Sequence, residues 1–411
     1  MRCAEMVAAA LLALSMPFGS ALHGAAIGAA DDVRALPRAH EQLLESGARV
    51  VVMAPRAELP PDRVELQLAL PFGWADDASP AGSGLARLVA DHVTLACGEP
   101  RVEAELLPTV LLLRAGSSVG EVEKLLAGVV DALTGARLND ESFAALLAAP
   151  AQSPVDPLLR WREAATPQSA EGLGAARQRP EAPTQEELRA FLAARCGCEG
   201  ATLALVTAAD APPLLLAAGR VLERLPRAKG VAAPWVRELP AALPRRVAAP
   251  AGASDDTVGL RIAWSDDRNG DRLALAAAFL AAAAGRSPTW VERDRQGGLV
   301  AFADSRRDGA LATTLARAVV ALQTEGGLSE TAFGALQSAF TADVERTLAS
   351  PVAQARQLAL DGTLYAAPFA AAGRAARWRA LGRAAAEAAL RESLRPQALV
   401  EVVAPRMEAG Q

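Results

Sequence analysis

Apolar residues follow strand spacing in two successive segments of the first half of the chain. Residues 50–53 are wholly apolar and predict a buried strand, whereas the alternation of apolar and polar residues over 64–70 predicts a strand with one face in water. Pro60 and Pro61 predict the turn between them. We therefore expect this half to begin with a pair of strands.

Capping signals locate two of the helices that follow. Asn139 predicts the N-cap of a helix, with Leu138 before it as a hydrophobic staple. Thr184 and Glu187 have the spacing of a capping box, and the helix that they open carries its apolar residues on one face. The other elements expected in this half are a helix at 119–133, a short helix near Leu158 and Leu159, a strand at 201–207 and a helix at 212–225.

The second half repeats the first at an offset of 190 residues. The matched residues are mostly apolar positions and a staple before a cap, which two copies of one fold would keep for packing. The matched pairs are Leu70 and Leu260, Trp74 and Trp264, Leu125 and Leu315, Val129 and Val319, Val130 and Val320, Thr134 and Thr324, Leu138 and Leu328, Phe143 and Phe333, and Leu146 and Leu336. Between the copies, residues 227–256 lose this periodicity and contain four prolines, which predicts a stiff linker.

Composition is that of a globular chain. The 411 residues are 51% hydrophobic and 22% charged, with a net charge of −5. The arginines are scattered among acidic residues, so no nucleic-acid surface is predicted. The Ala- and Leu-rich run at 273–284 predicts a buried helix and is too short to span a membrane. The length exceeds what one hydrophobic core usually holds, which predicts two domains.

The N-terminus has the order of a secretory signal peptide. Arg2 precedes an apolar run at 6–14, and Pro17 and small residues follow that run. We therefore expect residues 1–30 to be removed on export and the mature chain to be periplasmic or secreted.

Three cysteines remain after that segment, Cys97, Cys196 and Cys198, in a compartment that permits disulfides. A bridge from Cys97 to either of the other two stays open. The spacing of Cys196 and Cys198 is shorter than the C-x-x-C of redox and zinc sites, so we favour a silent role for these thiols over a metal site.

The stretch at residues 84–92 is the most informative about chemistry. Its apolar residues recur at helical spacing and predict an amphipathic helix with a buried apolar face. Arg87, Asp91 and His92 lie off that face. We interpret Arg87 and Asp91 as an i, i+4 ion pair on the helix surface, stabilising by about 0.3 kcal/mol.

This stretch resembles the zinc helix of the pitrilysin/insulinase metallopeptidases, in which Gly-Leu-Ala precedes H-x-x-E-H, two histidine ligands and a glutamate base. Here those positions read Arg87, Ala90 and Asp91. A guanidinium group repels the metal, and Ala90 has no group that could take a proton from metal-bound water. His92 lies one residue past the second ligand position, about 100° around the helix. We therefore predict no catalytic residue, no metal ligand and no cofactor.

Two further segments resemble the same family without its functional groups. The stretch at 143–150 resembles the helix that would supply a third, glutamate ligand, yet it contains no acidic residue. Residues 290–300 resemble the arginine- and tyrosine-bearing segment that helps active members to hold substrate. The position of its tyrosine is occupied by Ala301 or Phe302, and the single tyrosine of the chain, Tyr365, lies elsewhere.

The resemblance extends over roughly residues 48–405 and implies an α+β fold. It implies two duplicated domains, each a mostly antiparallel sheet packed with helices, that together form a clam-like chamber. With the boundaries above, we expect a signal peptide at 1–30, an N-terminal pitrilysin-like domain at 31–226, a Pro-rich linker at 227–256 and a C-terminal pitrilysin-like domain at 257–411.

Three functions fit these patterns. Relatives without the zinc motif pair with an active sister chain, so the resemblance favours a non-catalytic subunit that binds extended peptide or regulates an intact zinc peptidase. A stand-alone structural or peptide-binding role, like that of respiratory-complex core subunits in the family, is the second. The third is a residual hydrolase with an unrecognised site, although the sequence has no Ser-His-Asp order, phosphate loop or G-x-S-x-G elbow.

Overall fold

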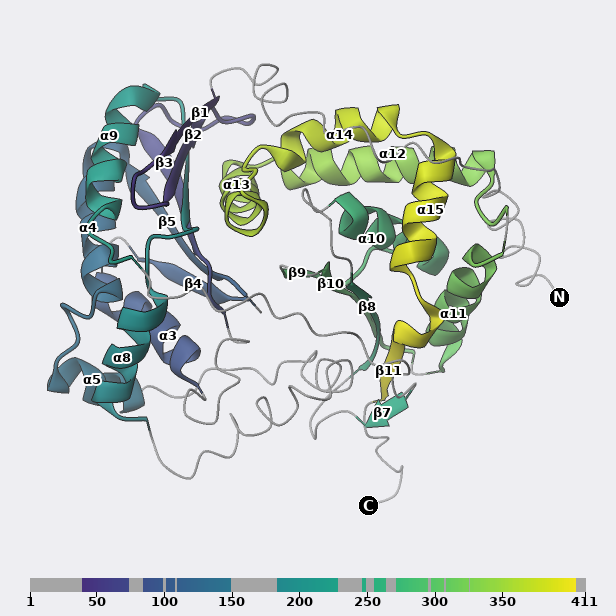
Figure 1. Ribbon diagram of the computed structural model, residues 1–411, viewed down its shortest axis with the longest axis horizontal. Helices are drawn as coiled ribbons and strands as arrows, with labels where there is room; N and C mark the ends of the chain where they lie inside the picture. The colour runs from purple at the N-terminus through teal and green to yellow at the C-terminus, as the bar shows by residue number, and fades with distance from the viewer. Residues whose placement is uncertain are drawn as a thin grey trace.

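A computed structural model of the chain contains two mixed β-sheets, each packed with helices (Figure 1). The structure describes residues 39–73, 84–98, 101–107, 109–148, 183–227, 246–248, 255–263, 271–294, 297–306, 308–324 and 326–403. The signal peptide predicted at 1–30 and the short helix predicted near Leu158 lie outside these residues.

The N-terminal sheet has six strands in the order β1-β2-β6-β3-β5-β4. Neighbouring strands run antiparallel except β2 and β6, which pair in parallel. The strands are β1 (Ala39–Leu43), β2 (Arg49–Met53), β3 (Arg63–Leu70), β4 (Glu103–Leu106), β5 (Leu111–Ser118) and β6 (Thr202–Thr207). The first strand, β1, was not predicted from the sequence, because only Leu43 in it is strongly apolar and that side chain is exposed.

Helices cover one face of this sheet. They are α3 (Leu85–Cys97), α4 (Val122–Leu133) after the short η2 (Val119–Glu121), α5 (Asp140–Ala148), α8 (Gln185–Arg195) and α9 (Ala211–Leu222). Their apolar faces and the sheet form one hydrophobic core. Both predicted caps are confirmed: Asn139 Oδ1 accepts a hydrogen bond from the Ser142 N–H at 2.8 Å, and Thr184 and Glu187 form a complete capping box.

The C-terminal sheet has five strands in the order β7-β11-β8-β10-β9. They are β7 (Arg246–Ala248), β8 (Asp256–Ala263), β9 (Trp290–Asp294), β10 (Gly297–Asp304) and β11 (Leu399–Val403). The helices of this part are α10 (Asp271–Ala284), α11 (Ala310–Leu322), α12 (Glu330–Thr347), α13 (Pro351–Tyr365), α14 (Ala370–Ala380) and α15 (Arg383–Ser393), followed by η3 (Pro396–Ala398). Strand β7 falls within the range predicted as a linker, where it pairs in parallel with β11.

The strand order of the C-terminal sheet repeats five strands of the N-terminal one. Strands β2-β6-β3-β5-β4 correspond to β7-β11-β8-β10-β9, and in each sheet the strand that comes last in the chain forms the one parallel pair. The matched residues behave alike for the most part, since Leu125 and Leu315 are both buried. Val130 is buried whereas Val320 is 53% exposed, so that pair does not keep its role.

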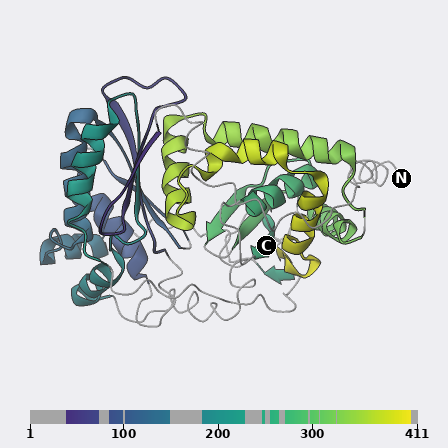
Figure 2. The ribbon, with the colours of Figure 1, turned by 45° about the horizontal axis from the view of Figure 1, so that its top comes forward.

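Helix α13 lies on the opposite face of the N-terminal sheet, although it comes from the C-terminal part of the chain (Figures 1 and 2). Its buried residues include Ala355, Leu358 and Ala359, and the helix packs against β6 and β3. This contact corrects the prediction of a half-exposed strand at 64–70. Gln67 and Ala69, on the face expected in water, are 3% and 0% exposed because α13 covers them.

Polar contacts fix the N-terminal half of α13 in place. Gln354 is fully buried, and its amide donates to the Ala54 carbonyl at 3.0 Å and accepts from the Arg56 N–H at 3.2 Å. Arg356 holds Glu105 of β4 with two hydrogen bonds of 2.7 and 3.1 Å. Both polar atoms of the Gln354 amide are therefore satisfied by the backbone of the loop that follows β2, as a buried amide requires.

Gly362 sets how closely α13 approaches the sheet. A Cβ atom at this position would lie 2.5 Å from Cγ2 and 2.7 Å from Oγ1 of Thr202 in β6. We expect Gly362→Ala to destabilise the protein by about 1–3 kcal/mol, because the helix must move away from the sheet. Urea unfolding followed by circular dichroism measures this change.

Gly334→Ala is the matched control. Gly334 lies inside α12 with no atom within 4 Å of the position of the new Cβ. There the substitution should stabilise by about 0.5–1 kcal/mol, since alanine loses less backbone entropy than glycine in a helix. Equal unfolding midpoints for Gly362→Ala and the parent would contradict the seating of α13 on Thr202.

Candidate site: the degenerate zinc-motif helix

The positions that resemble a zinc motif lie on α3, which begins after Gly84 in a left-handed conformation, φ 86°. Arg87 and Asp91 lie on its outer side, with side chains 46% and 38% exposed. Arg87 Nε donates to Asp91 Oδ2 at 3.0 Å, which confirms the predicted i, i+4 ion pair. Ala90 is 3% exposed and belongs to the core under the N-terminal sheet.

These three residues do not fit a zinc ion. The guanidinium of Arg87 occupies the position of the first ligand and engages the only carboxylate of the motif. The methyl group of Ala90 replaces the base and packs among apolar side chains. Zinc in catalytic sites takes neutral imidazoles and free carboxylates, and neither type is available here. The three motif positions of this helix therefore offer neither a zinc ligand nor a base.

The helix that would supply a third ligand also lacks one. Helix α5 packs beside α3, with Leu146 buried and Phe143 half-buried. Its acidic residues, Asp140 and Glu141, lie in the first turn and are exposed. In the part of the chain that the structure describes, no group of three or more His, Cys, Asp and Glu side chains is placed to hold a metal ion.

His92 departs from the sequence prediction. It was expected off the buried face, yet it is 2% exposed and its Nε2 has no hydrogen-bond partner. Burial lowers the pKa of His92 below its ordinary value of 6.5, and a hydrogen bond to the backbone of Ala132 opposes this shift only in part. His92 is therefore a neutral core side chain between α3 and α4. The spacing of apolar residues in α3 could not show this burial, because the side chain of His92 is covered by α4, a separate helix that packs beside α3.

The segment expected to resemble a substrate-holding motif forms the hairpin of β9 and β10. Ala301 and Phe302, the two candidates for the tyrosine position, are both fully buried, Phe302 under the helices and Ala301 on the opposite face. Tyr365 lies at the end of α13 instead. Arg295 lies outside the described residues. Neither candidate position therefore presents a hydroxyl group.

The cysteines do not pair among the described residues. Cys97, Cys196 and Cys198 are free thiols, which corrects the bridge that the sequence left open. Full burial raises the pKa of Cys196, so its thiol stays protonated and unreactive. Cys198 Sγ donates to the Ser46 carbonyl at 3.2 Å. These contacts support the silent role expected for Cys196 and Cys198.

No protein-family model and no curated protein matches the sequence, whereas many solved structures match the fold. An inactive M16 peptidase domain from Pseudomonas fluorescens matches with a TM-score of 0.66 at 16% identity, over 90% of this chain and 98% of that one. The fold is that of the M16 peptidases. At this identity the likeness shows the fold alone.

Two further solved structures share this fold at low sequence identity. A chain of Complex III2 from Candida albicans matches with a TM-score of 0.66 at 13% identity, over 89% of this chain and 95% of that one. Pitrilysin matches with a TM-score of 0.54 at 14% identity, over 90% of this chain and 45% of its own length. The chain thus spans one half of a pitrilysin molecule. No described helix is long and apolar enough to cross a membrane.

We predict that the purified chain binds no stoichiometric zinc, and that Arg87→His, Ala90→Glu and Asp91→His together do not restore it. The triple variant regains two imidazoles and a base, but α5 still offers no carboxylate from Phe143 onward. Elemental analysis and chelator-sensitive cleavage of unstructured peptides are the measurements. One zinc per chain in the parent, or in the triple variant, would contradict this account.

His92 should make the fold sensitive to acid. The unfolded state takes up a proton near pH 6.5, whereas the folded state with its lowered pKa does not. Stability contributed by the neutral imidazole is therefore complete above pH 6.5 and falls as the pH drops below it, with a slope of at most about 1.4 kcal/mol per pH unit. Urea unfolding at intervals from pH 8 downward measures this slope.

His92→Leu removes the titrating group and should flatten the slope. His40→Gln is the control, because His40 lies exposed on the edge strand β1 and should leave the slope unchanged. A parent-like slope in His92→Leu would show that other groups cause the acid sensitivity.

Proposed function

We propose that this chain is a non-catalytic M16-type subunit that binds peptide or regulates an intact zinc peptidase chain. The observation that carries the proposal is the state of α3, in which an Arg87–Asp91 ion pair and a buried Ala90 stand at all three motif positions. The helix keeps its fold, but the side chains at its motif positions can neither bind zinc nor act as a base. A chain that keeps such a framework without the catalytic groups has binding as its remaining use.

The two hydrophobic cores support the inference that the sequence is still selected to fold. Both sheets have well-filled cores, and the C-terminal core includes Leu315, Val319, Leu336 and Phe340, each almost completely buried. The repeated strand order supports our inference that the two sheets belong to duplicated domains. Packing of this kind is lost early when a sequence is no longer selected to fold.

We infer the kind of partner from the length of this chain relative to pitrilysin. Because pitrilysin is about twice as long as this chain, a second M16-type chain would complete a particle of that size. We propose that the partner carries an intact H-x-x-E-H motif, that the pair holds extended peptides and that both chains are exported, as the N-terminal sequence suggests. Such a contact would bury on the order of 1,600 Å² or more.

A structural role is the alternative with a specific observation in its favour, since a chain of Complex III2 from Candida albicans has this fold. In that case the chain would assemble with other proteins without changing a peptidase rate. A residual hydrolase with an unrecognised site is the third candidate. Its activity would not depend on a partner.

Co-expression with an M16 chain that carries H-x-x-E-H tests the proposal. We expect one heterodimer peak in gel filtration at micromolar concentration and a higher peptidase rate than that of the partner alone. Replacing the partner's motif glutamate with glutamine should abolish the rate of the pair, because this chain supplies no base.

Each other outcome favours another candidate. Separate elution with a fully active partner would reject the proposal and favour the structural role. Cleavage that persists after loss of the partner's glutamate would favour the residual hydrolase. Arg87→Ala is the control within this chain, because the exposed ion pair should matter neither for assembly nor for rate.

A further inference from the structure

The cluster between α13 and the N-terminal sheet meets the core of the C-terminal sheet between α13 and α14. Phe369 belongs to the cluster that α13 forms with the N-terminal sheet. Ala371 and Trp378, in α14, belong to the core of the C-terminal sheet. The boundary between the two cores therefore falls at Ala370, within a short turn of the chain.

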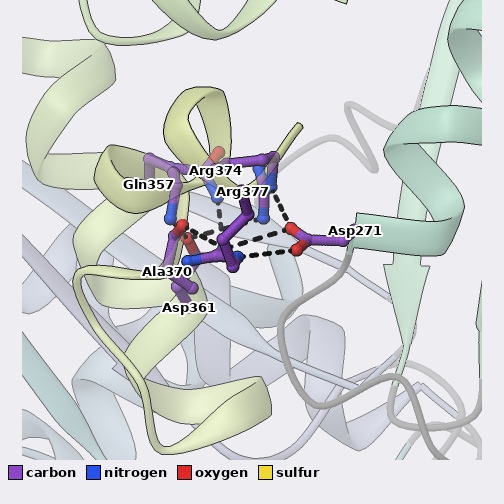
Figure 3. Close-up of polar contacts among 7 residues, drawn as sticks. Asp271, Gln357, Asp361, Ala370, Arg374 and Arg377 are labelled. Carbon is purple, nitrogen blue, oxygen red and sulfur yellow. Dashed lines mark hydrogen bonds and ion pairs between the residues drawn. The ribbon is translucent and has the colours of Figure 1, made fainter. Parts of the chain in front are cut away.

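Asp361 organises this turn from inside α13. The residue is fully buried, and its Oδ1 accepts a hydrogen bond from Gln357 Nε2 at 2.7 Å. Its Oδ2 accepts from the Ala371 N–H at 3.0 Å and so caps the first turn of α14 (Figure 3). The backbone oxygen of Asp361 accepts hydrogen bonds from the Ala366 and Ala367 N–H groups. One residue thus holds both sides of the turn.

Arg374 connects Asp361 to the core helix α10. It is 3% exposed, with Nη2 3.9 Å from Asp361 Oδ2 and Nε donating to Asp271 Oδ1 at 2.8 Å. Arg377 Nε donates to Asp271 Oδ2 at 2.9 Å (Figure 3). Asp271 is the first residue of α10, which contributes Leu273 to the C-terminal core. A continuous polar chain thus runs from α13 to α10.

The two carboxylates hold Arg374 charged. Burial by itself would lower the pKa of Arg374, but the negative charges of Asp361 and Asp271 outweigh burial and raise the pKa above its ordinary value. Removing the Asp361 or the Asp271 carboxylate would leave the buried guanidinium of Arg374 without one of its two negative neighbours. Such a loss is costly in a protein interior.

The turn itself is strained. Ala366 has φ 52° and ψ 27°, and among the described residues it is the one non-glycine residue with positive φ. This conformation is unfavourable for an L residue with a Cβ atom and persists only where surrounding contacts impose it. The Asp361 contacts impose it here, since they bond the N–H groups of Ala366 and Ala367.

We propose that the α13–α14 junction is a hinge between the two sheets. The junction consists of Asp361, Ala366, Arg374 and Asp271, and the Asp361–Arg374 contact stabilises the observed arrangement. Helix α13 stays with the N-terminal sheet because apolar packing and the Gln354 and Arg356 contacts hold it there. The contacts at the junction are polar, and although Asp361 and Arg374 are buried in the observed arrangement, water can replace these contacts once the junction opens. Hinge motions of this kind use a few residues at element ends.

Distance measurement between paired spin labels tests the hinge. The labels are placed at Leu216→Cys in α9 and Val320→Cys in α11, two exposed sites on opposite sides of the junction, in a background without Cys3 and Cys97. We expect Asp361→Asn to raise the fraction of molecules at longer distance by roughly tenfold, within the range of a coupling between two parts of a protein. Ala366→Gly added to Asp361→Asn should reverse much of this change, because glycine adopts the turn without strain.

Arg272→Met is the matched control. Arg272 is the neighbour of Asp271 in α10 and pairs with the exposed Glu392 at 2.8 Å, away from the junction. Its substitution should leave the distance distribution unchanged. Identical distributions for folded Asp361→Asn and the parent, or equal broadening by Arg272→Met, would overturn the proposal.

A folding control keeps the test decisive. Far- and near-ultraviolet circular dichroism reports whether Asp361→Asn keeps both cores. If it does not fold, Arg374→Lys replaces it, because lysine keeps the charge but cannot reach both carboxylates with a planar fork. The long-distance fraction of Arg374→Lys then decides: an increase supports the hinge, and a parent-like distribution overturns it.

Discussion

The contact between α13 and the N-terminal sheet determines the rest of the structure. The second face of that sheet is apolar in β2, β3 and β6, and an apolar sheet face must be covered. Its cover comes from the C-terminal part of the chain, so the N-terminal sheet cannot bury this face without that part. The close approach at Gly362 and the buried amide of Gln354 leave the helix one position along the strands.

The same sheet also divides the residues of α3 into those that pack against it and those on the outer side of the helix. Helix α3 packs on the other face of the same sheet, and its buried residues, Leu85, Val89 and Val93, contribute to folding whatever stands on its outer side. Arg87 and Asp91 on the outer side can therefore change at little cost in stability, whereas Ala90, at the third motif position, packs in the core.

Much of the fold could be predicted from the sequence because its signals are local. The capping box of Thr184 and the N-cap of Asn139 involve residues three apart, and the Arg87–Asp91 pair four. The position of α13 could not be predicted in this way, because Gln354 finds its partner 300 residues earlier in the chain. His92 was misjudged for the same reason: its burial depends on α4, a separate element.

The position of β6 has a consequence for synthesis on the ribosome. This strand lies between β2 and β3 in the sheet but follows both in the chain, so a nascent chain cannot close the sheet before Thr207 has emerged. The helix that covers the second face begins at Pro351, 144 residues later. Throughout that interval the apolar face of β2, β3 and β6 is open to other nascent chains. Folding of this protein therefore depends on late, long-range contacts, a topology that favours slow folding.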